Sequence, residues 1–249
     1  MLRKHIKVEP ARWYYHCDKI GMLVWQDMPS GAAYPGDQIA VALPNAGIHV
    51  EDKNYKRFKR ENEAARAQFT AELREMVNAL RDTVCVCTWV PFNEGWGQFD
   101  SLQAAQLLWE LDATRLVDHA SGWHDQGGGD FKSRHVYFRP VRLKHDKIRV
   151  LALSEFGGYS LPVAGHVGSA KSFGYRMYQK PAAFMDALVK LYENEVIPCM
   201  EKQGLSAAVY TQVSDVEDEV NGLLTYDRKV CKADVRRMKA VNEKLKFPM

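Results

Sequence analysis

Two glutamates follow apolar stretches of the chain, where a carboxylate could act as an acid, a base or a nucleophile. Residues 84–89 lead into the segment Val90-Pro-Phe-Asn-Glu94-Gly-Trp-Gly97, and residues 151–153 lead into Ser154-Glu155-Phe-Gly-Gly158. The two glycines after the second glutamate let backbone and ligand approach each other closely. Each apolar stretch reads as a strand, so each carboxylate is predicted at the carboxyl end of a strand.

Two carboxyl groups at one rim suit glycoside hydrolysis. One of them protonates the leaving oxygen, while the other attacks the anomeric carbon or activates water. Either glutamate alone is equally compatible with an ion-paired surface carboxylate. Aromatic faces suit the apolar faces of sugar rings, although a single tryptophan is more often part of a core. The candidates near strand ends or in loops are Trp25, Trp89, Trp96 and Trp123.

The elements that must position these residues alternate between short apolar stretches and helical stretches. This alternation is the signature of an α/β fold with a parallel sheet and crossover helices. Helices are predicted over 10–21, 54–82 and 232–245, with two more beginning at Asp100, as an N-cap, and at Pro181. Seven strands are predicted, at 1–7, 22–25, 84–89, 116–119, 135–137, 148–153 and 207–210.

Long loops follow the strands, at 28–50, 121–133 and 156–180, whereas the connections from helices into strands are short. This asymmetry is typical of a TIM (β/α)8-type barrel, which keeps its chemistry at the carboxyl ends of the strands. Such a barrel needs eight strands. Because Met1 already lies within a predicted strand, we expect that the first βα unit and upstream domains are absent. Residues 1–249 are then one catalytic barrel that starts in the second strand.

Charge and composition exclude several classes of protein. The formal net charge of +3 over 249 residues gives no electrostatic footprint for nucleic acid or an anionic membrane. No apolar run approaches the roughly 18 to 20 residues that span a bilayer, so no membrane association is expected. The first residues carry no apolar stretch of the secretory type. The compartment stays open, with a periplasmic or secreted intact protein compatible with the sequence.

The five cysteines do not form a recognisable disulfide framework. Cys85 and Cys87 would point to the same face of a strand, where burial is favoured over a metal or redox role. His119 and His135 end predicted strands, and a structural role is favoured over contact with substrate.

Four separated motifs resemble a known family. Phe92-Asn-Glu-Gly-Trp96 resembles the Asn-Glu signature of the clan of retaining barrel glycosidases, and Ser154-Glu-Phe-Gly-Gly158 resembles their nucleophile strand. The segment from Leu2 through 13–21 to Asp27 is similar to a stretch of glycoside hydrolase family 2 enzymes. Residues 221–223 with 226–228 are similar to that family's region after the last strand. From the second strand onward, the chain therefore resembles the catalytic TIM-barrel domain of this β-galactosidase-like family.

The resemblance implies that Glu94 is the general acid/base and Glu155 the nucleophile. The implied activity is hydrolysis of a terminal β-linked sugar through a covalent glycosyl-enzyme, without a cofactor or metal. Upstream β-sandwich domains are implied for the intact protein. In a retaining enzyme the two carboxyl groups are expected about 5 to 5.5 Å apart.

The resemblance also implies a set of substrate-binding residues. Asn93 would hydrogen-bond the sugar 2-hydroxyl, while Arg3 and Asp27 match rim positions that support the nucleophile or hold substrate. Tyr137 is a candidate partner for Glu155. Independently of the resemblance, Trp96 and Trp123 are candidate sugar contacts because of their aromatic faces. One motif departs from the family. Its β-galactosidases often carry Arg-x-x-His on the second strand, whereas here Ile6 takes the histidine position.

Two rival functions remain at this stage. A catalytically incompetent barrel fragment or a carbohydrate-binding module is motivated by the expected missing strand, which would leave an open sheet edge. A TIM-barrel enzyme of another class could use the two glutamates for proton abstraction. The lack of a metal-ligand cluster and of a phosphate-binding loop in the sequence argues against that second rival.

Overall fold

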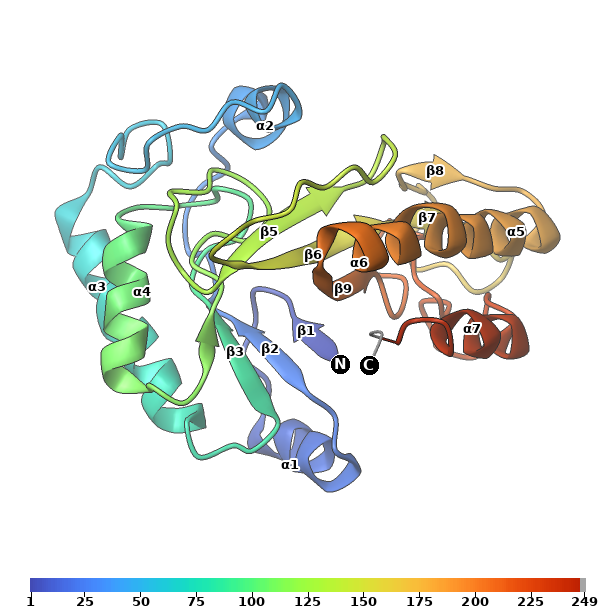
Figure 1. Ribbon diagram of the computed structural model, residues 1–249, viewed down its shortest axis with the longest axis horizontal. Coiled ribbons are helices and arrows are strands. Elements are labelled where there is room, and N and C mark those ends of the chain that lie inside the picture. Colours follow the sequence, from blue (N-terminus) through green and yellow to red (C-terminus); the bar gives the residue numbers. More distant parts are fainter. Residues whose placement is uncertain (247–249) are drawn as a thin grey trace. The chain divides into compact units, whose positions relative to one another are not determined.

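The computed structural model describes residues 1–246, which fall into two compact units. The first unit comprises Met1–Arg134 and the second begins at His135. Each unit combines parallel strands with the helices that connect them (Figure 1). The α/β class predicted from the sequence is therefore confirmed.

The first unit is built on a four-stranded parallel sheet. Its strands follow chain order, so each is joined to its neighbour by a crossover connection. Arg3 pairs with Trp25, and Gln26 pairs with Trp89, so the carboxyl ends of the first three strands lie at one edge. The strands are β1 (Leu2–Lys4), β2 (Val24–Asp27), β3 (Val86–Val90) and β4 (Leu116–Val117).

Three main helices pack against this sheet through one hydrophobic core. They are α1 (Ala11–Ile20), α3 (Glu63–Leu80) and α4 (Ser101–Leu111) (Figure 1). The loop after β2 also carries a π-helical turn, η1 (Gln38–Ala42), and the short α2 (Leu43–Asn45). Buried residues of all three main helices join the strands, among them Cys17, Leu73, Val86, Trp89 and Leu108.

In the first unit, α3 starts later than predicted, and α4 starts after Asp100 as predicted but without a side-chain cap. The helix predicted over 54–82 begins only at Glu63, because the side chain of Asn62 caps it by accepting from the Ala65 N–H at 3.2 Å. Asp100 does precede α4, but with a left-handed backbone (φ +41°) and no side-chain cap. Its carboxylate instead accepts from the Tyr55 hydroxyl at 2.7 Å.

The second unit is built on the sheet β5-β6-β9, in which β6 and β9 are parallel. These strands are β5 (Phe131–Val136), which starts at the end of the first unit, β6 (Val150–Gly157) and β9 (Leu205–Thr211). A short parallel pair, β7 (Tyr159–Ser160) and β8 (Arg176–Met177), was not predicted, since two residues carry no periodicity. All seven predicted strands are present, with shifted ends.

One long helical run covers this sheet. It consists of α5 (Pro181–Leu191), the π-helical turn η2 (Tyr192–Val196) and α6 (Ile197–Gln203). Its apolar face packs on β6 in a core that includes Leu153, Phe156, Phe184 and Leu188. Among residues 1–246, no helix combines the length and the apolar character needed to cross a membrane.

The last helix, α7 (Val235–Asn242), begins three residues later than the predicted start at Lys232. The Asp234 carboxylate caps it by accepting two backbone N–H groups. Lys232 is instead buried ahead of the helix, where its ammonium donates to the Asp215 carboxylate at 2.6 Å. It also donates to the carbonyls of Leu161 and Val220, which replace water around the charge.

Candidate functional site

Arg3, at the carboxyl end of β1, binds two of the predicted site residues in the first unit. Its guanidinium meets the Asp27 carboxylate in a bidentate pair, with Nε at 3.0 Å and Nη2 at 2.8 Å. The same Nη2 donates to the Asn93 side-chain oxygen at 2.8 Å. Both charged side chains are almost fully buried, at 2% and 1% exposure. The structure thus brings together Arg3, Asp27 and Asn93, which lie up to 90 residues apart in sequence.

This network fixes which way the Asn93 amide faces. Because Oδ1 accepts from Arg3, the amide nitrogen Nδ2 lies on the other side, where it is 3.2 Å from Nε2 of His5. An amide nitrogen carries two hydrogens, so Nδ2 can donate one to the imidazole and one to a ligand. Asn93 is therefore an oriented donor at the end of β3.

Glu94 follows Asn93 in a strained turn. Its backbone is left-handed at φ +52°, a conformation that costs energy for a residue with a side chain. Backbone bonds hold the turn, since the Glu94 N–H donates to the Ser121 carbonyl at 3.0 Å and the Ser121 N–H donates to Phe92. The loop after β4 thereby sets the direction of the half-buried Glu94 side chain.

The His124 ring packs against Gly95 in the same turn, and no sequence pattern predicts this contact. A Cβ at Gly95 would lie 2.6 Å from the imidazole, so only glycine fits there. The buried ring accepts from the Val50 N–H at 3.1 Å, and Nε2–H donates to the Ile39 carbonyl at 2.8 Å. Burial lowers the pKa of His124, consistent with a neutral ring that accepts at one nitrogen and donates at the other.

The four candidate tryptophans divide into two groups. Trp25 and Trp89 are buried, and Trp89 belongs to the core of the first unit, where its indole N–H donates to Asp112 at 3.1 Å. Trp96 and Trp123 are half-buried. Trp96 packs against Tyr34 with ring centroids 5.0 Å apart. Only these two keep ring surface that a sugar could contact.

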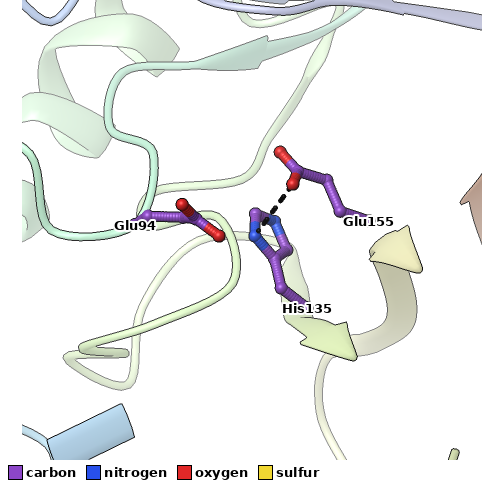
Figure 2. Close-up of side chains that lie close together, drawn as sticks. All are labelled: Glu94, His135 and Glu155. Carbon is purple, nitrogen blue, oxygen red and sulfur yellow. Dashed lines mark ion pairs between the residues drawn. The ribbon is translucent and has the colours of Figure 1, made fainter. Parts of the chain in front are cut away.

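In the second unit, Glu155 lies near the carboxyl end of β6 and receives two side chains from β5 and the residue after it. The Tyr137 hydroxyl donates to Glu155 Oε2. Nδ1 of His135 lies 3.4 Å from the same oxygen, and the imidazole is fully buried. Figure 2 shows the His135 ring facing this carboxylate. Sequence reasoning placed Tyr137 here, but favoured a structural role for His135.

Tyr137 is itself held in place by neighbours. Its hydroxyl lies 3.2 Å from the Thr211 hydroxyl at the end of β9. Its ring stacks on Tyr175 with centroids 3.7 Å apart and planes within 5° of parallel. Tyr137 is thus a hydrogen-bond donor to Glu155 that is held in place at its hydroxyl and on its ring face.

Comparison with known proteins identifies the fold. The chain matches no protein-family model and no curated protein. Among solved structures it is similar to the β-D-glucuronidase of Dictyoglomus thermophilum (TM-score 0.66, 12% identity, covering 99% of this chain and 44% of that one). It is also similar to the Faecalibacterium prausnitzii β-glucuronidase (TM-score 0.61, 16% identity, 99% and 43%).

A third similar structure is Bacteroides uniformis β-glucuronidase 2, covalently bound to cyclophellitol-6-carboxylate aziridine (TM-score 0.52, 12% identity, 91% and 29%). The chain spans less than half the length of each of these three proteins. At such low identity the likeness establishes a β-glucuronidase-like glycosidase fold.

Proposed function

We propose that this chain is the catalytic part of a retaining β-glycoside hydrolase of the family 2 type. The observation that carries the proposal is the environment of Glu155. A carboxylate at the end of a parallel strand receives a tyrosine hydroxyl and faces a buried histidine. Residues 1–249 are proposed to be one TIM-type barrel domain, which the chain order of the parallel strands supports.

The first step forms a bond between Glu155 and the sugar. A carboxylate oxygen of Glu155 attacks the anomeric carbon, and the bond from that carbon to the glycosidic oxygen breaks. The leaving oxygen takes a proton from Glu94 and departs as an alcohol. The hydrogen bond from Tyr137 holds the attacking carboxylate in one orientation, which lowers the entropy cost of reaching the transition state.

The second step releases the sugar and restores both glutamates. Glu94, now ionised, accepts a proton from water, and the water oxygen attacks the anomeric carbon. The ester bond to Glu155 breaks, and its carboxylate is regenerated. Two inversions at the same carbon leave the product with the β configuration of the substrate.

Asn93 is the proposed partner of the sugar 2-hydroxyl. Its Nδ2 is oriented by Arg3 and His5, so a donor is fixed before substrate arrives. A hydrogen bond to the 2-hydroxyl that strengthens in the transition state contributes to the rate rather than to binding alone. Trp96 and Trp123 are the proposed aromatic contacts for the sugar.

The proposed substrate is a terminal β-linked sugar, and β-glucuronides are the first class to test. The three similar structures are all described as β-glucuronidases. The β-galactosidase-like motifs make β-galactosides the second class, although Ile6 breaks the Arg-x-x-His pattern.

Proton NMR of the reaction mixture tests this function. We would incubate the chain with p-nitrophenyl β-glucuronide, β-galactoside, β-mannoside and β-glucoside, and follow the anomeric proton of the first product. The β anomer should form first from at least one substrate, and Glu155→Gln should abolish the reaction. First formation of the α anomer would contradict the retaining mechanism, and no hydrolysis of any glycoside would favour the binding-module alternative.

A further inference from the structure

Tyr175 lies against the residue that holds the proposed nucleophile. Its ring stacks face to face on Tyr137 at 3.7 Å, and Phe138 and Phe173 contact it edge-on at 5.2 and 5.6 Å. Tyr137 can rotate about its Cα–Cβ bond, and a wrong rotation would carry its hydroxyl away from Glu155. A ring packed flat on Tyr137 restricts this rotation.

The backbone holds Tyr175 from both sides. On one side, Phe173 bonds to the loop after β9, donating to the Asp218 carbonyl at 2.7 Å and accepting from the Val220 N–H at 3.0 Å. On the other side, Arg176 pairs with Tyr159 in the short β7-β8 pair. The long loop after β7 is therefore anchored on either side of the ring that stacks on Tyr137.

Gly158 makes room for the stack. It directly follows β6, and its backbone is left-handed at φ +61°. A Cβ at this position would lie 2.3 Å from Tyr175 Cδ2 and 3.2 Å from Tyr137 Cδ1. The glycine at the end of Ser154-Glu-Phe-Gly-Gly158 thus allows the stacked pair to approach the nucleophile strand.

We propose that Tyr175 is a positioning residue for the nucleophile. It acts through Tyr137 by keeping the phenol directed at the Glu155 carboxylate. The expected effect of Tyr175 on the reaction rate rests on the proposed function. Its expected effect on the orientation of Tyr137 rests on the stacking geometry alone. Removing one ring of such an aromatic pair changes an equilibrium or a rate by about threefold to tenfold.

The test compares four variants of the whole chain. Tyr175→Met and Tyr175→Leu remove the ring, whereas Tyr175→Phe keeps it. Tyr178→Leu is the matched control, because Tyr178 lies three residues further along the chain, just after β8, and packs on Tyr159 and Phe184 instead. Each protein is labelled with ¹³Cζ-tyrosine. The Tyr137 signal is assigned by its disappearance in Tyr137→Phe. Its chemical shift in Glu155→Gln serves as the reference for a Tyr137 without a hydrogen bond to a carboxylate.

We expect the Tyr137 signal of Tyr175→Met and Tyr175→Leu to move toward its position in Glu155→Gln. Their kcat should fall by about threefold to tenfold with KM nearly unchanged. Tyr175→Phe and Tyr178→Leu should keep the wild-type signal and kcat. An unmoved Tyr137 signal in both ring-removing variants, or an equal loss of kcat in Tyr178→Leu, would overturn the assignment. If the wild type hydrolyses no glycoside, the proposed function fails, and the NMR comparison still decides whether Tyr175 positions Tyr137.

Discussion

Arg3 is the residue on which the Asn93 donor depends. Its planar guanidinium satisfies a carboxylate and an amide oxygen at once, in a buried setting where each bond to a charged group contributes about 1.5–3 kcal/mol. Lysine offers a single ammonium in place of this fork. A substitution that keeps the positive charge at this position therefore does not keep the hydrogen-bond network.

We predict that Arg3→Lys lowers kcat/KM by about 10- to 100-fold, because it releases Asn93 and leaves Asp27 less well paired. Steady-state kinetics on the best substrate measure the loss. Arg237→Lys is the matched control, since that arginine pairs with Asp186 on the surface. Equal kinetics for Arg3→Lys and the wild type would show that the network does not orient the site.

The role of Glu94 predicts a dependence on the leaving group. A general acid contributes about 10²- to 10⁴-fold to the rate when the leaving oxygen needs a proton. Glu94→Ala should therefore slow alkyl β-glycosides by about that factor, and slow activated dinitrophenyl glycosides far less during glycosylation of Glu155. Rates measured over a series of leaving groups check this. Equal losses across the series would show that Glu94 is not the acid.

Glu94 and Glu155 could be selected from the sequence because each follows a predicted strand, whereas Tyr137 was suggested as a partner for Glu155 by the family resemblance. Sequence reasoning could not reach His124 or Tyr175. His124 packs against Gly95, 29 positions away, and Tyr175 stacks on Tyr137, 38 positions away. Contacts at such separations leave no periodic pattern in the sequence. A histidine that supports a glycine looks the same in the sequence as any other histidine.

At the scale of elements, the sequence predicted the strands better than the starts of helices. Apolar stretches mark buried strands directly, whereas a helix start depends on local competition between capping groups. Asn62 caps the start of α3, and Asp234 caps the start of α7. The charged stretch before Asn62 has a helix-like composition, so composition alone placed the start of α3 too early.

The buried pair Lys232–Asp215 connects the segment before α7 to the loop after β9. Removing one partner of such a pair leaves an unpaired buried charge, which costs about 3–5 kcal/mol. We predict that Lys232→Met lowers the free energy of unfolding by about this amount, as measured by urea denaturation. Lys229→Met, at an exposed position, should change it by less than about 0.5 kcal/mol. A similar small effect for both would contradict a structural role for the pair.

At the scale of the whole molecule, two α/β units with parallel sheets reproduce a glycosidase fold at 12 to 16% identity. Alternation of strands and helices is enough to specify such a fold, and many sequences satisfy it. The fold alone does not specify the chemistry. The proposed function therefore rests on a few side chains near the carboxyl ends of the strands rather than on the fold.

The most direct test of the account is to trap the glycosyl-enzyme. The chain would be incubated with cyclophellitol-6-carboxylate aziridine and with 2-deoxy-2-fluoro β-glycosyl fluorides of the sugars it hydrolyses, then digested and mapped by mass spectrometry. We predict one adduct per chain, attached to the peptide that contains Glu155, and no adduct in Glu155→Gln. A label on any other residue, or turnover of glycosides without a trapped intermediate, would contradict the assignment of Glu155 as the nucleophile.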